Sequence, residues 1–188
     1  MLRVAAWTLV VLFPVTEVAL SLFKRSRAKA AAGRDRGSLL LLWAAVAAGV
    51  TAGLLARGIP AGWLRVPGGI VEPTALALML SGLAVRWWAI AVLGPYFTTN
   101  VAVEECQPVI QGGPYRFVRH SSYVGLLLAL AGIGVMMASW LSLVVLLVPA
   151  ALATLHRIRV EERALLATLG LSYADYCGRT RRLIPGVF

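Results

Sequence analysis

Residues 123–155 carry no formally charged side chain, and this long run restricts the folds that the chain can adopt. As a single helix, its 33 residues would be about 50 Å long, whereas the hydrocarbon core of a bilayer is about 30 Å thick. Two helices that break near Ala138 and Ser139 would each be short, but each could span with help from its flanking residues. The run therefore predicts a membrane protein with either one long span or a hairpin at this place.

Three further stretches are apolar and long enough for transmembrane helices, which need about 20 residues each. We predict these spans over Val4–Phe23, Leu39–Ala56 and Thr74–Leu93. Hydrophobic residues make up 60% of the chain, whereas soluble domains average about 45–50%. The composition therefore agrees with the bilayer as the solvent for most of the chain.

The first span is followed by a basic cluster and not by a small-residue cleavage site. The cluster consists of Lys24, Arg25, Arg27 and Lys29. Basic residues directly after an apolar stretch are a stop-transfer pattern, whereas a signal peptide ends in a cleavage site. We therefore expect the first span to remain in the mature protein.

The distribution of positive charge decides between the long helix and the hairpin. With a hairpin, the segments 24–37 and 94–121 and the C-terminal tail share one side, with six, two and six Lys and Arg residues respectively. Arg3, Arg57 and Arg65 then lie on the opposite side. Because basic loops face the cytosol, we expect five spans, an N-terminus outside and a cytosolic C-terminus. The charge thus marks a membrane face and does not predict nucleic-acid binding.

The predicted fold class is all-α. We expect a polytopic membrane helix bundle of about five transmembrane helices, the last two a hairpin, followed by a cytosolic C-terminal helical tail. Residues 1–188 form a single integral membrane domain, in which residues 1–72 hold the first two spans with their linker and loop. Residues 73–188 hold the remaining spans and the polar motifs.

A dense polar cluster lies in GGPYRFVRHSSYVG, residues 112–125, directly before the fourth span. A hairpin brings His120 close to Arg157, Glu161 and Glu162, which follow the fifth span. Such a pocket would suit a charged cofactor that meets a lipophilic substrate at the cytosolic membrane surface. The alternative is a charge cap of Arg116, Arg119 and His120 that reaches to the headgroups.

Several ionisable or aromatic residues admit two interpretations each. Arg157 and Glu161 could form an i,i+4 salt bridge or orient an acidic substrate group. An ionisable residue inside a membrane span suggests a functional site. Arg86 could reach to the membrane surface, pair with Glu17 or contact substrate. Tyr173 and Tyr176, on a predicted amphipathic tail helix, could pack on the membrane or close over the cofactor.

Two stretches, 86–125 and 157–186, resemble the isoprenylcysteine carboxyl methyltransferase family and its phospholipid methyltransferase relatives. The family patterns are GPYxxxRHPxYxG, EExxL, FGxxYxxY and a terminal Arg-x-x-Pro. The matching residues are Gly113, Pro114, Tyr115, Arg119, His120, Tyr123, Gly125, Glu161, Glu162, Leu165, Gly170, Tyr173, Tyr176, Arg182 and Pro185. Leu169 stands for the usual Phe, and Ser121 stands for the proline after Arg-His. We expect Ser121 to cap the fourth span with its hydroxyl.

The resemblance implies S-adenosylmethionine as cofactor, bound without a Rossmann domain, and makes residues 73–188 the catalytic core. It places Tyr115, Arg119, His120, Tyr123, Gly125, Glu161 and Glu162 at the cofactor. We further expect Arg157 and Glu161 to be catalytic, and Arg86, Tyr173 and Tyr176 to bind substrate. The expected partners are membrane lipids and a lipophilic acceptor with a carboxylate, amine or phenol as nucleophile.

Two other functions compete with methyl transfer. A sterol-type membrane reductase would bind NADPH through the six arginines of the tail, and a small membrane protein without catalytic activity would bind no cofactor. No metal site is expected, because Cys106 and Cys177 lack the spacing of metal ligands or of a CxxC motif and are interpreted as ordinary thiols. The sequence does not predict an oligomeric state.

Overall fold

The computed structural model describes residues 2–23, 37–67, 69–99, 103 and 107–186. Within these residues the α-helices are α1 (Leu2–Phe23), α3 (Ser38–Ala56), α4 (Val71–Leu93), α5 (Ser121–Met136), α6 (Trp140–Leu169) and α7 (Leu171–Arg179). Short 3₁₀ turns occupy Pro60–Gly62, Gly94–Tyr96 and Gly113–Arg116. The all-α prediction is confirmed for this part of the chain. Cys106 and the basic cluster after the first span lie outside the described residues.

The predicted hairpin is present as α5 and α6. The helix breaks where expected, at Ala138, which has a φ of 54°, in the left-handed region that L residues rarely adopt. Ser139 then caps α6, because its hydroxyl accepts a hydrogen bond from the Ser142 amide at 3.2 Å. The left-handed conformation of Ala138 ends α5, and the N-cap at Ser139 begins α6. Residues 123–155 therefore form two helices and not the single long helix.

In the part of the chain that the structure describes, four helical segments are long and apolar enough to cross a membrane: Arg3–Leu20 within α1, Ser38–Ala56, Val71–Tyr96 and Trp140–Leu169. α5 is apolar but has only 16 residues, about 24 Å at 1.5 Å per residue. α6 has 30 residues, about 45 Å, and therefore exceeds the hydrocarbon core of about 30 Å. Its C-terminal part carries Arg157, Glu161 and Glu162 beyond the expected end of the span at Leu155.

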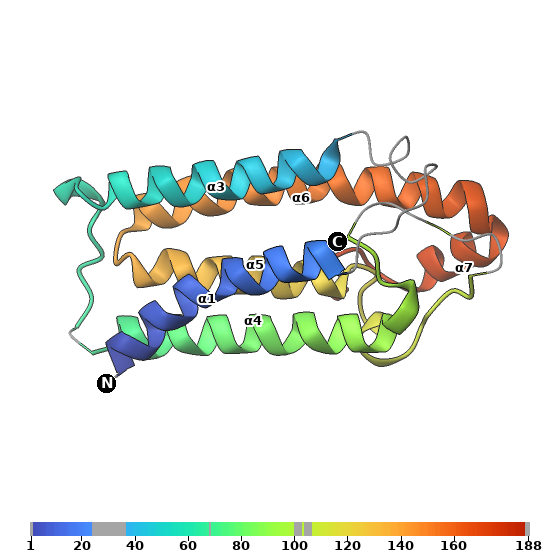
Figure 1. The fold of residues 1–188 in the computed structure, drawn as a ribbon, viewed down its shortest axis with the longest axis horizontal. Helices are drawn as coiled ribbons and strands as arrows, with labels where there is room; N and C mark the ends of the chain where they lie inside the picture. The colour runs from blue at the N-terminus through green and yellow to red at the C-terminus, as the bar shows by residue number, and fades with distance from the viewer. Residues whose placement is uncertain (1, 24–36, 68, 100–102, 104–106, 187–188) are drawn as a thin grey trace.

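The bundle has two distinct ends (Figure 1). α3 lies along α6, and α4 lies along α5, while α1 packs across α4 and α5. The N-terminus, the connection from α3 to α4 and the turn between α5 and α6 lie at one end. The start of α5, the end of α4 and α7 lie at the other. This second end is the one that the charge pattern predicts to be cytosolic.

Ser121 does not cap α5, so that prediction is wrong. The N-cap residue is His120, which makes no side-chain capping bond, and the Ser121 hydroxyl instead donates to the Val118 carbonyl at 2.8 Å. Ser121 is already the first helical residue, and its hydroxyl points back to the preceding turn. The helix start is held by contacts with the tail that are described below.

Two glycines let α4 and α5 approach closely. A Cβ at Gly82 would lie 2.4 Å from the Ala129 amide nitrogen and 2.7 Å from the Gly125 carbonyl oxygen. A Cβ at Gly125 would lie 2.6 Å from the Gly82 carbonyl oxygen and from the Arg86 nitrogen. Small residues at such crossings allow the backbones of membrane helices to touch. Gly125 therefore sets the distance between the two helices that carry Arg86 and Ser122.

Replacing Gly82 with leucine is expected to force α4 and α5 apart, since the new side chain meets backbone atoms that cannot move by rotation. Overpacking of this kind lowers the free energy of unfolding by about 3 kcal/mol. Denaturant unfolding of the purified protein in detergent measures the loss. Ala84→Leu, on the exposed face of the same helix, is the matched control and should unfold as the wild type does. Equal stability of both variants would contradict the close crossing.

Candidate active site

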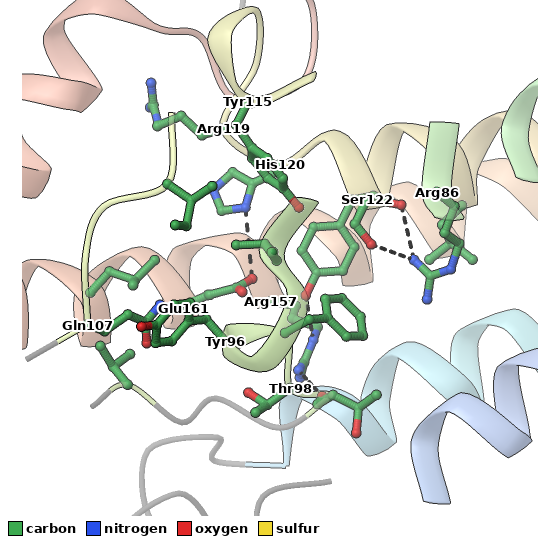
Figure 2. Close-up of a pocket in the computed structure, with 18 of the residues that line it drawn as sticks. Arg86, Tyr96, Thr98, Gln107, Tyr115, Arg119, His120, Ser122, Arg157 and Glu161 are labelled. Atoms are coloured by element: carbon green, nitrogen blue, oxygen red, sulfur yellow. Dashed lines mark hydrogen bonds and ion pairs between the residues drawn. The ribbon is translucent and has the colours of Figure 1, made fainter. Parts of the chain in front are cut away.

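One cavity lies at the second end of the bundle, between the helices and the segments that follow α4 (Figure 2). Its polar part is lined by Tyr115, Arg119, His120, Tyr123, Arg157, Glu161, Tyr173 and Tyr176. An apolar arm, defined as Leu39, Leu42, Trp43, Val46 and Leu126, continues from it between the helices, and Glu17 and Arg86 also line the wall. Leu42, Val46 and Leu126 of the arm belong to a buried cluster that also includes Phe13, Met79, Leu130 and Leu146. A single space thus joins polar groups to a lipophilic compartment.

The turn at Gly113–Arg116 places the first aromatic ring of the cavity. Gly113 has a φ of 57°, which glycine adopts without strain, and Pro114 begins the 3₁₀ turn. Tyr115 is buried against the end of α4, where its hydroxyl donates to the Ala89 carbonyl at 3.3 Å. Burial raises the pKa of the Tyr115 hydroxyl, so it remains a donor at neutral pH.

Glu162 binds three side chains from two segments, Arg119 and His120 before α5 and Arg182 in the tail. Its carboxylate accepts from Arg119 Nε at 3.1 Å and lies 3.2 Å from His120 Nε2. It also accepts from Arg182 Nε at 2.9 Å, and the hydrogen bond to Glu162 raises the pKa of the Arg182 guanidinium. The carboxylate is buried, and hydrogen bonds to an ionised group are stronger than hydrogen bonds between neutral groups. Glu162 therefore fixes Arg119 and His120 in place.

Backbone bonds attach the tail to the segment before α5. The Arg119 amide donates to the Arg181 carbonyl at 2.8 Å, and the His120 amide donates to the Arg182 carbonyl at 3.1 Å. Arg119 Nη1 also donates to the carbonyls of Cys177, at 3.2 Å, and Thr180. These bonds hold α7 over the polar part of the cavity. Cys177 is a free thiol, and burial raises its pKa.

Tyr173 and Tyr176 close over the cavity and do not pack on the membrane surface. Both are buried on α7, with ring centroids 6.0 Å apart. The Tyr176 hydroxyl donates to the Tyr115 carbonyl at 2.6 Å. Burial raises the pKa of Tyr176 to about 12, so this donor keeps its proton at neutral pH. Both tyrosines therefore line the cavity, and closure of α7 over a cofactor stays a prediction.

Tyr176→Phe is expected to loosen α7 without emptying the space that the ring fills. Loss of this hydrogen bond is expected to cost about 1 kcal/mol. For a ligand that α7 covers, this cost corresponds to an affinity about fivefold lower. Titration with S-adenosylhomocysteine, the product of the cofactor that the family resemblance implies, measures the change, and Tyr96→Phe, at another lining residue of the cavity, is the control. An unchanged affinity for Tyr176→Phe would show that closure of α7 does not depend on this bond.

Arg157 joins four segments at the boundary between the polar part and the arm. Its Nε donates to the Tyr123 hydroxyl at 2.8 Å, its Nη1 donates to Ser38 Oγ at 2.9 Å, and its Nη2 donates to the Thr99 carbonyl. The residue is 3% exposed. Because all three nitrogens have protein partners, Arg157 holds the start of α3, the segment after α4 and Tyr123 together.

Glu161 faces the cavity one turn further along α6. Figure 2 shows His120 and Glu161 pointing toward one another, with 3.8 Å between His120 Nδ1 and Glu161 Oε2. This distance permits an ion pair but exceeds a hydrogen bond. Among the described residues, Glu161 Oε2 is buried without a hydrogen-bond partner. A buried oxygen of this kind is rare, and here it faces the cavity.

Arg86 pairs with Glu17, one of the three readings from the sequence. Its Nε and Nη2 donate to the two carboxylate oxygens of Glu17. Its Nη1 donates to the Ser122 carbonyl and to Ser122 Oγ, both at 3.0 Å (Figure 2). Both charged residues are buried. The pair connects α1 to the α4–α5 crossing and forms part of the wall of the cavity.

Most of the predicted site residues line this cavity, and two do not. Among the described lining residues, Glu162 and Gly125 are absent, because Glu162 lies behind Arg119 and His120 and Gly125 lies at the helix crossing. Arg116 is exposed and stacks on the Phe117 ring at 4.4 Å. The charge-cap interpretation thus fits Arg116 alone and fails for the buried His120.

Several lining residues were not predicted from the sequence. They are Tyr96, Phe97, Thr98, Thr99 and Gln107, together with the apolar arm. The aromatic and hydroxyl residues of GPYFTT, directly after α4, were the available signal, because polar aromatic residues at a span end are candidates for a site. Within the described residues, no cluster of three or more His, Cys, Asp or Glu residues that could hold a metal ion is present.

Residues 75–167 match the family model of the isoprenylcysteine carboxyl methyltransferase (ICMT) family. Protein-S-isoprenylcysteine O-methyltransferases B and A of Arabidopsis thaliana are 30% and 31% identical to this chain. The alignments cover 60% and 62% of this chain and 58% and 60% of the relatives. Uncharacterized protein YpbQ of Bacillus subtilis (strain 168) is 29% identical, over 47% of this chain and 53% of that protein.

A solved structure has the same fold. It is the eukaryotic intramembrane Ras methyltransferase ICMT without a monobody, with a TM-score of 0.59 and 20% sequence identity. The similarity covers 88% of this chain and 55% of that one, so this chain spans somewhat more than half the length of the proteins that it matches. With the four long apolar helices of its described residues, it is an integral membrane protein, and the family model, the named relatives and the shared fold support the isoprenylcysteine carboxyl methyltransferase family.

Proposed function

We propose that the chain is an S-adenosylmethionine-dependent methyltransferase that acts on a lipophilic acceptor at the cytosolic membrane face. The observation that carries this proposal is the single cavity that joins a polar, aromatic part to an apolar arm within the helix bundle. The family match supports the reaction type, and the relatives' names support an isoprenoid acceptor. A methyl donor is polar and an isoprenoid is not, so the two parts of the cavity suit the two reactants.

The residues of the polar part fit S-adenosylmethionine, which when bound supplies a methyl group on a sulfonium. The faces of Tyr115, Tyr173 and Tyr176 can attract the sulfonium. Arg119 is held by Glu162 and the tail carbonyls through Nε and Nη1, and we propose that its Nη2 meets the cofactor carboxylate. The orphan oxygen of Glu161 can accept from an ammonium or a hydroxyl.

The chain contributes to the reaction mainly by orientation and by exclusion of water. Arg157 fixes Tyr123 at the boundary where the two reactants meet, and α7 covers the polar part. Alignment of nucleophile and methyl carbon in a closed site accounts for much of a rate enhancement. We propose Glu161 and Arg157 as the catalytic pair, with Glu162 and Gly125 as positioning residues. Arg86 forms the wall beside the acceptor and so shapes the arm.

Transfer of labelled methyl groups from S-adenosylmethionine into a membrane lipid extract tests this function. Purified wild-type protein should place label in the organic phase. Arg119→Ala should lower the transfer by about a hundredfold, because the charge-assisted hydrogen bond proposed between Arg119 Nη2 and the cofactor carboxylate is lost, at about 2–3 kcal/mol. Arg116→Ala, three residues away and exposed, is the matched control and should leave transfer unchanged. Absence of label with wild-type protein would refute the proposal.

The cytosolic placement of the site is a separate proposal, supported by the basic residues at this end of the bundle. The test uses a variant in which Cys106→Ser and Cys177→Ser remove the native thiols, so that only one introduced cysteine can react. Ser172→Cys, exposed on α7, should react with a membrane-impermeant maleimide only in inside-out vesicles. Arg65→Cys, exposed at the opposite end, should react only in right-side-out vesicles. The reverse pattern would place the site outside.

A further inference from the structure

The ion pair of Glu17 and Arg86 lies within the apolar spans of α1 and α4, and both residues line the cavity. Both are buried. A buried ion pair is often no more stabilising than two well-packed apolar residues of similar volume. Stability alone therefore does not account for two charges at this depth, and the other partner of Arg86 indicates what else the pair does.

The third nitrogen of the Arg86 guanidinium reaches α5. Its Nη1 donates to the Ser122 carbonyl oxygen and to Ser122 Oγ, both at 3.0 Å (Figure 2). The reach is short because α4 and α5 touch here, where a Cβ at Gly125 would lie 2.6 Å from the Arg86 backbone nitrogen. Arg86 therefore ties α4 to the first turn of α5.

This first turn of α5 carries two side chains of the cavity. They are His120, the N-cap residue, and Tyr123, and their ring centroids are 5.9 Å apart. The His120 carbonyl accepts a hydrogen bond from the Tyr123 amide at 2.9 Å, so a single backbone turn holds both rings. A shift of this turn would therefore displace two lining residues together.

Glu17 determines the direction of the Arg86 guanidinium. Its two carboxylate oxygens accept from Nε and Nη2 of Arg86. Because the guanidinium is a planar and rigid fork, binding of this edge keeps Nη1 directed at Ser122. Glu17 belongs to α1 and lies outside residues 75–167, which match the family model. A helix outside the matched region thus reaches the site through Arg86.

We propose that Glu17 is a positioning residue for methyl transfer, which acts through Arg86 on the first turn of α5. By holding that turn, it keeps the His120 and Tyr123 side chains aligned with the reactants. This inference rests on the proposed function and adds α1 to the part of the chain that the reaction needs. Because small misplacements of reacting groups cost large factors in rate, the effect should appear in kcat.

Arg86→Lys separates the ion pair from the contact with Ser122. Lysine keeps a positive charge for Glu17, but a single ammonium nitrogen cannot occupy both ends of the guanidinium. The variant should stay folded, with a kcat for methyl transfer about tenfold lower than that of wild type. Thr16→Ala is the control and should keep the wild-type kcat, because the Thr16 hydroxyl donates to the Phe13 carbonyl of its own helix.

The double variant Glu17→Leu with Arg86→Leu removes the pair without leaving a buried charge, and hydrogen exchange measures its effect without a methyl donor. The amides of residues 121–126 should exchange about tenfold faster than in wild type, because the turn opens locally, while those of α3 should not change. A general loss of stability would instead accelerate exchange in both helices.

Wild-type kcat in Arg86→Lys and in the double variant would overturn the inference. So would unchanged exchange in the first turn of α5, or equal acceleration in α3. A wild-type protein that transfers no methyl group would instead overturn the proposed function, whatever the exchange shows.

Discussion

Replacing Glu162 with glutamine is expected to destabilise the protein and to abolish most cofactor binding. The substitution leaves Arg119, His120 and Arg182 without the carboxylate that they share. Removal of one partner from a buried ionic cluster lowers the free energy of unfolding by about 3–5 kcal/mol. Because Arg119 and His120 line the cavity, their displacement should weaken binding of S-adenosylhomocysteine by about a hundredfold, or about 2.7 kcal/mol.

The neighbouring residue provides the control for this prediction. Glu161→Gln is the same chemical change one position away, at a side chain that is 31% exposed and has an unpaired oxygen. Its free energy of unfolding in denaturant should stay close to that of wild type. If Glu161→Gln destabilised the protein as much as Glu162→Gln, the assignment of the structural role to Glu162 would be wrong.

Replacing Arg86 with leucine is the second change with a large expected effect. Glu17, which is 3% exposed, would lose the guanidinium that binds both its oxygens. An uncompensated buried charge lowers the free energy of unfolding by about 3–5 kcal/mol. Most of this loss should appear as a lower unfolding midpoint in detergent, together with release of α1 from α4.

The double variant Glu17→Leu with Arg86→Leu isolates the cause. Buried ion pairs replaced on both sides by apolar residues are often neutral in stability, so the double variant should recover most of the loss. Coupling between the two substitutions would show that the pair acts as one unit across α1 and α4. Additive losses from the two single variants would contradict the pairing.

The hairpin and the approximate site were predictable because they depend on length and charge. A run of 33 uncharged residues cannot remain in one span, and the arginines of the tail must return to the basic face. The turn at Ala138 and Ser139 then follows from local geometry. Once α5 and α6 are antiparallel, His120 necessarily comes close to the turn of α6 that carries Glu161 and Glu162.

Other features were not predictable because they depend on which face of a helix meets which neighbour. Glu161 and Glu162 are adjacent in sequence but point about 100° apart on the helix, so one faces the cavity and the other the tail. Gly125 matches the family motif, yet its role at the α4–α5 crossing emerges only from the position of Gly82. The apolar arm is a gap between helices, and no single stretch of sequence encodes it.

The central claim is that two distant polar segments form one cofactor cavity at the end of the hairpin, and titration calorimetry of the purified protein tests it most directly. S-adenosylhomocysteine should bind with one-to-one stoichiometry, and His120→Ala should weaken this binding by about tenfold or more, or about 1.4 kcal/mol. NADPH should give no heat of binding. Binding of NADPH in place of S-adenosylhomocysteine, or an affinity that does not change in His120→Ala, would contradict the account.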